Sequence, residues 1–129
     1  MTPLDQTVFG NGENGNDVGN CWQACIASIC DLPLDTVPHF AKEFPKDWWV
    51  RTRQFVINST GVDFGCFNPD FPLTDQGYYV IGCGIGPRGV MHSVILDGVT
   101  GELAHDPHPS HLGLQGPVIE VFGFIKLEE

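Results

Sequence analysis

The spacing of apolar residues changes near Gly61, and this change limits the folds open to the chain. Before Gly61, residues 21–32 are apolar on nearly every side and residues 45–58 carry one apolar stripe. These patterns are typical of a buried helix and an amphipathic helix. After Gly61, short apolar runs separated by turn residues predict strands, over residues 62–67, 77–83, 90–96, 102–106 and 118–127. Helices followed by antiparallel strands predict an α+β fold with N-terminal helices packed on an antiparallel β-sheet.

The 129 residues are expected to form one domain over 1–129, with residues 1–20 as a lead-in that contains a Gly/Asn-rich loop. Asn20 is the expected N-cap of the first helix, and Pro33 is expected to end it. Gly61 is the expected stop of the second long helix. The glycine-rich segment at 82–86 is expected to be a hairpin turn between two strands, because a phosphate-binding loop would have to open a helix.

Acidic residues outnumber basic ones, and the formal net charge is −10. Such a chain repels nucleic acid and anionic membranes, so neither is an expected partner. No apolar run approaches the roughly 18 residues of a membrane span. The five cysteines are odd in number and no secretion signal is evident, which predicts free thiols and a cytoplasmic protein.

Cys21 is a candidate nucleophile because it stands at the expected start of the buried helix. Free N–H groups and the helix dipole favour an anion there, so the thiol ionises more easily. A structural role as a small buried residue is the simpler reading of Cys21 taken alone.

His92 and Asp106 supply the groups that would make Cys21 catalytic. If residues 97–101 form the turn of a hairpin, the numbers of any two residues that face each other add up to 198. His92 then faces Asp106 on one side of the sheet. Opposed Cβ atoms lie roughly 5 Å apart, so the carboxylate could orient the imidazole. A slip of one residue in register would break this contact.

A helix-start Cys, a strand His and a downstream Asp follow the chain order of papain-like cysteine peptidases. The stretches GNCWQACIAS, MHSVILDG and AHDP resemble the compact bacterial branch, which includes bacteriocin-processing peptidases. The whole chain is also similar to small, mostly uncharacterised phage and bacterial proteins. This resemblance implies a papain-like fold and a Cys21-His92-Asp106 triad, and it leaves the substrate open. We expect a peptide or protein substrate and no cofactor. For a phage-encoded chain, the location implied is the cytoplasm of the bacterial host.

The papain-like pattern has a Gln about six residues before the nucleophile, where its amide helps to bind the oxyanion. Here position 15 is Gly, so Gln6 is the expected oxyanion residue, with Asn16 and Asn20 as alternatives. Trp22 and His108 are candidates to line the cleft.

Two other functions stay open at this stage. The chain could be a catalytically idle papain-like scaffold that binds or inhibits a partner protein, as a phage effector does. It could less readily bind a metal, through the histidines at 105, 108 and 111 or through Cys21 and Cys25. Because Pro107 and Pro109 interrupt the histidine cluster, no metal site is predicted. The leading expectation is a cysteine hydrolase that cleaves a peptide, isopeptide or related amide bond.

Overall fold

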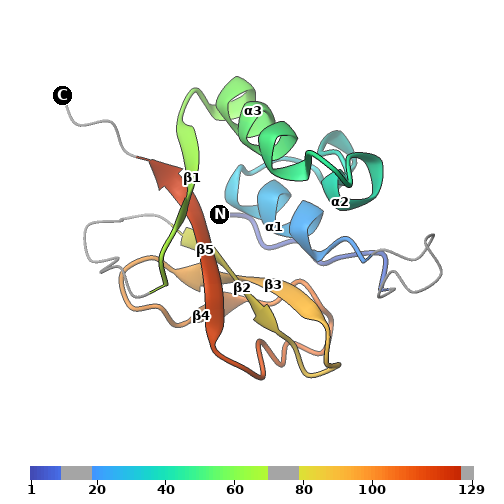
Figure 1. Cartoon of the computed structure of the whole chain (residues 1–129), viewed down its shortest axis with the longest axis vertical. Helices are drawn as coiled ribbons and strands as arrows, with labels where there is room; N and C mark the ends of the chain where they lie inside the picture. Colours follow the sequence, from blue (N-terminus) through green and yellow to red (C-terminus); the bar gives the residue numbers. More distant parts are fainter. Residues whose placement is uncertain (10–18, 70–78, 126–129) are drawn as a thin grey trace.

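The computed structural model describes residues 1–9, 19–69 and 79–125 (Figure 1). The first half contains α1 (Cys21–Ile29), the short 3-10 helix η1 (Leu34–Thr36), α2 (Phe40–Glu43) and α3 (Trp48–Thr60). The second half contains β1 (Asp63–Phe67), β2 (Tyr79–Ile85), β3 (Met91–Asp97), β4 (Leu103–His105) and β5 (Val118–Ile125). Helices thus precede strands, as the change of periodicity at Gly61 predicts.

The five strands form one antiparallel sheet in the order β1-β5-β2-β3-β4. In Figure 1 the helices lie together on one side of this sheet, with α1 nearest to the strands. The expected α+β class, with N-terminal helices packed on an antiparallel sheet, is therefore confirmed. No helix in the described parts of the chain is both long and apolar enough to cross a bilayer.

Helix α1 ends at Ile29, three residues earlier than the sequence pattern predicts. Asp31 adopts a left-handed conformation with φ of 54°. Its N–H donates to the Ser28 carbonyl, and the Leu32 N–H donates to the Ala27 carbonyl. This is the Schellman arrangement, which satisfies the last carbonyls of a helix, so the chain turns away before Pro33.

Two apolar clusters hold the sheet, one on each face. The helix side buries Ile26, Phe40, Phe64 and Ile95 together with the partly buried Trp48 and Trp49. The opposite side buries Val80, Val94, Leu96 and Val121, with Leu114 from the long segment before β5 packed against them. Because both faces of the sheet are buried, each side chain of β3 is held on one particular face. This also determines the face on which His92 lies.

The glycine-rich segment at 82–86 is not the hairpin turn that the sequence suggests. Gly82 and Gly84 lie inside β2, and the turn follows at residues 86–90, where the Gly86 N–H donates to the Val90 carbonyl. A Cβ at Gly84 would stand 2.5 Å from the Pro117 carbonyl oxygen. Glycine is needed there because the segment before β5 crosses the strand at close range.

Candidate active site

Cys21 lies where the N-terminus of α1 meets an open edge of β3. Strand β4 pairs only with Ile95 and Leu96, so in the described chain it leaves the edge at Met91–Ser93 uncovered. Cys21 occupies this place, with the backbone N–H and hydroxyl of Ser93 both directed to its sulfur. The thiol also hydrogen-bonds the His92 imidazole. The short β4 therefore lets a helix start and a strand side chain meet.

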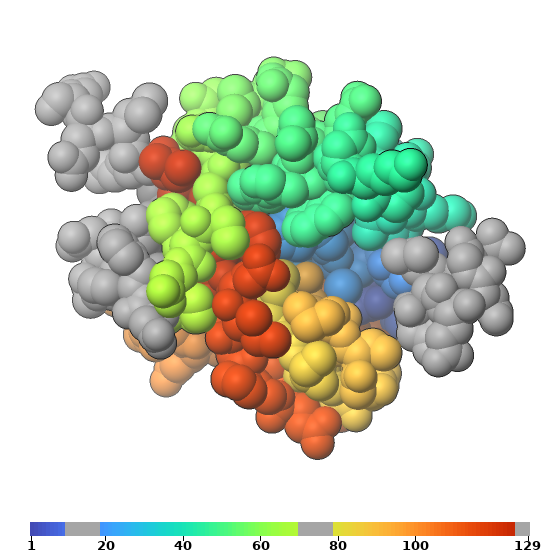
Figure 2. Space-filling view, viewed as in Figure 1, coloured from blue at the N-terminus to red at the C-terminus, as the bar shows by residue number. Residues whose placement is uncertain are grey.

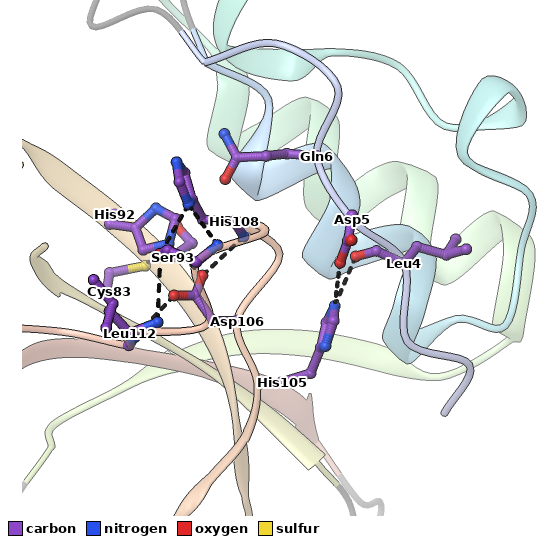
Figure 3. Close-up of polar contacts among 12 residues, drawn as sticks. Leu4, Asp5, Gln6, Cys83, His92, Ser93, His105, Asp106, His108 and Leu112 are labelled. Carbon is purple, nitrogen blue, oxygen red and sulfur yellow. Dashed lines mark hydrogen bonds and ion pairs between the residues drawn. The ribbon is translucent and has the colours of Figure 1, made fainter.

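His92 is held between Cys21 and Asp106. Its Nε2 lies 2.6 Å from Oδ1 of Asp106, and both side chains are almost fully buried, at 5% and 1% exposed. Since Nε2 is engaged by the carboxylate, Nδ1 is the ring nitrogen left for the thiol. Figure 3 shows His92, Asp106 and His108 gathered at one place, beside Ser93 and Cys83.

Asp106 accepts three hydrogen bonds. Besides His92, its Oδ1 accepts the N–H of His108 at 2.9 Å, and its Oδ2 accepts the N–H of Gly113 at 2.8 Å. The carboxylate is therefore fixed by the loop that follows β4. An acid with all of its bonds made in this way stays ionised and keeps its orientation.

The predicted hairpin register is wrong, although the predicted contact is present. Ile95 pairs with His105 and Leu96 with Leu103, and a bulge lies between the two pairs. In neither pair do the two residue numbers add up to the 198 that was predicted. Continued by one residue, this register places Asp106 opposite Val94, so its carboxylate reaches His92 diagonally along the same face. The extra residue of the bulge carries no local signal in the turn sequence.

The electrostatics of the site favour an ion pair of thiolate and imidazolium. Burial by itself would raise the pKa of Cys21, but the hydrogen bonds and charge of His92 and the bonds from Ser93 outweigh it, and the pKa is lowered. Burial would lower the pKa of His92, yet its bonds to Cys21 and Asp106 raise it. The pKa of Asp106 is lowered because its three donors outweigh its burial.

In the other four cysteines the pKa of the thiol is raised and not lowered. Burial raises the pKa of Cys25, of Cys30 to about 11 and of Cys83 to about 12. Cys66 is exposed, and its pKa is raised by partial burial and by Glu120. All five thiols are free. Cys21 is thus distinguished from the other four by its neighbours.

Gln6 lies at the site, and Asn20 holds it there. The buried Gln6 side chain lines the same pocket as Cys21 and His92, and its Nε2 donates to the Val8 carbonyl at 2.9 Å. Asn20 does not cap α1 through its side chain, contrary to expectation. Its Oδ1 accepts the N–H groups of Thr7 and Val8, at 2.8 Å each. Asn20 is therefore a tether for the segment that carries Gln6; Asn16 lies outside the described residues.

Two pockets of about 260 Å³ each border His92. The first is mostly apolar, with Trp22, Trp48 and Phe122 in its wall. The second contains Cys21, Gln6 and the cleft candidates Trp22 and His108. In the space-filling view, blue N-terminal residues lie recessed between the helices and the strands (Figure 2). Cys21 thus lines a pocket together with residues of both layers, such as Trp22 of α1 and His92 of β3.

The three histidines that were considered as metal ligands each contact other groups. Nε2 of His105 lies 2.9 Å from the Leu4 carbonyl, Nδ1 of His108 contacts Ser110, and His111 packs edge-on against His105. In the described ranges, no three His, Cys, Asp or Glu side chains form a group that could hold a metal ion.

Ser93 is a site residue that no sequence pattern pointed to. Its side chain is buried, and its hydroxyl lies 3.2 Å from the Cys83 sulfur. The pairing of Cys83 with Ser93 across β2 and β3 follows from the hairpin turn, but the nearness of Cys21 does not.

No family model, curated protein or solved structure matches this chain.

Proposed function

We propose that the protein is a cysteine hydrolase with a compact papain-like fold, which cleaves a peptide, isopeptide or related amide bond. The observation that carries this proposal is the buried chain of contacts from Cys21 through His92 to Asp106. A structural cysteine needs neither a lowered pKa nor a histidine that is itself oriented by a carboxylate.

The mechanism follows from these contacts. The Cys21 thiolate attacks the substrate carbonyl carbon, and the His92 imidazolium then gives its proton to the leaving nitrogen. Water attacks the acyl-enzyme, with neutral His92 taking a proton from it, and the Cys21 thiolate departs. Asp106 keeps the imidazole in the orientation that serves both steps and stabilises its charged form.

Two groups can stabilise the oxyanion. The first-turn N–H of Cys21 has no partner within the helix, as at every helix start. The Gln6 amide borders the same pocket, and its nitrogen has a second N–H beyond the one given to Val8. A backbone and a side-chain donor together form an oxyanion hole.

The first test uses two reagents for the thiol. At neutral pH, limited iodoacetamide should alkylate Cys21 first, and p-nitrophenyl acetate should acetylate the same residue and turn over. Peptide mapping by mass spectrometry identifies the modified cysteine, and Cys21→Ala is the control. First labelling at Cys66 would contradict the proposal. Alkylation of Cys21 without acetylation would favour the idle scaffold that binds a partner.

The second test concerns Gln6 and Asn20. Acetylation passes through an oxyanion and alkylation does not, so the ratio of the two rates isolates the oxyanion hole. We expect Gln6→Ala to lower this ratio about 100-fold, as for one lost oxyanion donor. Asn20→Ala should lower it less, because the tether and not the donor is removed.

The double variant separates tethering from an independent role. If Asn20 acts only through Gln6, adding Asn20→Ala to Gln6→Ala causes no further loss in the ratio. Additive losses would show that Asn20 acts without Gln6. Circular dichroism of each variant checks that the fold is retained.

A further inference from the structure

The pocket that contains Cys21 differs in charge from the rest of the chain. Its lining includes Arg88, from the turn between β2 and β3, and His108, from the loop that closes over Asp106. No carboxylate of the described residues lines it, although the chain has 16 acidic and only 6 basic residues. A cationic spot beside the nucleophile is thus set in an acidic protein.

Arg88 is available for a ligand in a way that the other two arginines are not. Arg51 lies 3.0 Å from Asp47, and Arg53 is bound by both oxygens of Asp63, at 2.8 Å each. Arg88 forms no ion pair with any residue of the described chain. An exposed guanidinium is a preferred partner for a carboxylate, which it binds with two parallel hydrogen bonds.

His108 contributes a neutral donor. The Ser110 backbone N–H donates to Nδ1 of His108 at 3.0 Å, so Nδ1 is an acceptor and the neutral ring has its proton on Nε2. Burial and the nearby charge of Arg88 lower the pKa of His108, which keeps the ring neutral. Its Nε2–H can donate a hydrogen bond to a ligand beside the charge of Arg88.

Gln6 adds a complementary acceptor. Its Oε1 is buried and has no hydrogen-bond partner in the described structure. Figure 3 shows the Gln6 amide extended toward His92 and His108, with the oxygen on the histidine side. A buried acceptor without a partner is costly, and an N–H of a ligand would satisfy it.

We propose that this pocket binds a substrate carboxylate next to the scissile bond, through Arg88 and His108, while Gln6 accepts an amide N–H of the same substrate. The substrate class is then an amide whose nearest group is a carboxylate, such as the C-terminal residue of a peptide. This inference rests on the proposed function of Cys21 and names the substrate of that site.

The first experiment compares iodoacetate with iodoacetamide as alkylating agents of Cys21. The ratio of their rates cancels thiol reactivity and reports the preference for a carboxylate. Arg88→Gln should lower the ratio about fivefold, the effect of one solvated unit charge at about 4 Å. Arg53→Gln, which removes an equal charge away from the pocket, should leave the ratio unchanged. A ratio that is the same in wild type and Arg88→Gln overturns the inference.

The second experiment needs no nucleophile, so it separates this inference from the proposed function. N-acetylglycine, in which an amide adjoins a carboxylate, and neutral N-acetylglycinamide are titrated into Cys21→Ala, with the His108 ring followed by NMR. We expect N-acetylglycine to bind about fivefold more tightly, and Arg88→Gln to abolish the difference. Equal affinities in Cys21→Ala overturn the inference, whether or not Cys21 proves reactive.

Discussion

Asp106→Ala is expected to lower the free energy of unfolding by about 3–5 kcal/mol, the usual loss when one member of a buried ion pair is removed. The change leaves Nε2 of His92 and the N–H groups of His108 and Gly113 without their acceptor. Urea unfolding followed by circular dichroism measures the loss. Asp63→Ala is the matched control, because its carboxylate binds Arg53 at the surface, where ion pairs add little.

The difference in unfolding free energy between wild type and Asp106→Ala should become smaller as the pH falls. The pKa of Asp106 is lowered in the folded protein, so the unfolded state takes up the proton first on acidification. The stabilisation is therefore complete above the ordinary aspartate pKa and is lost as the pH falls through the lower, folded value. A gap between wild type and Asp106→Ala that widens toward acid would contradict the ion pair.

Asp106→Asn tests whether shape alone is enough. An amide keeps the outline of the carboxylate but replaces one oxygen by a donor. Because Oδ1 and Oδ2 both accept backbone N–H groups, that donor must face another donor in either orientation. We expect Asn to restore only part of the stability lost in Asp106→Ala, with about 1–3 kcal/mol still missing.

His92→Ala is expected to lower the rate of Cys21 alkylation by up to about 300-fold at pH 6. With His92 present, the pKa of Cys21 is lowered and that of His92 is raised, and both shifts favour the thiolate below the ordinary cysteine range. Without it, a thiol of ordinary pKa near 8.5 is about 0.3% ionised at pH 6. The measurement is the alkylation rate from pH 5 to pH 9, with the modified residue mapped at each pH.

The pH dependence of the alkylation rate in wild type and in His92→Ala shows whether His92 activates Cys21. The alkylation rate of wild type should change less between pH 6 and pH 8 than that of His92→Ala, which should rise about tenfold per pH unit. His111→Gln removes an exposed histidine that packs on His105 and should keep the wild-type profile. Parallel profiles for wild type and His92→Ala would mean that Cys21 is not activated by the imidazole.

The two long helices and the five strands could be predicted because each has a local signal. The strand runs end within a few residues of β1 to β5, and Gly61 ends α3 with φ of 74°. The order of the strands has no such signal. β1 pairs with β5 at the far edge of the sheet, and this partnership depends on burial of Phe64 and Phe122 under the helices.

Two sequence signals predicted the residues of the candidate site. They are the position of a cysteine at the start of a helix and the alternation of side chains along a strand. Alternation places His92 on the face of Val94 and Leu96, and the structure brings Cys21, His92 and Asp106 together. The bulge in β3–β4 and the tether by Asn20 were missed, because both depend on contacts between residues distant in sequence. That Gln6 lines the pocket while Asn20 only holds its segment in place also depends on such contacts, so the sequence could not separate the two residues.

The position of Asp106 outside β4 has a consequence for how such a protein can change. Its carboxylate is oriented by backbone groups of the loop that it begins, at His108 and Gly113, and not by the ladder that ends at His105. The turn between β3 and β4, by contrast, is closed by its own bonds around Asp97. Evolution could therefore lengthen or shorten that turn while the acid and its partner stay in place.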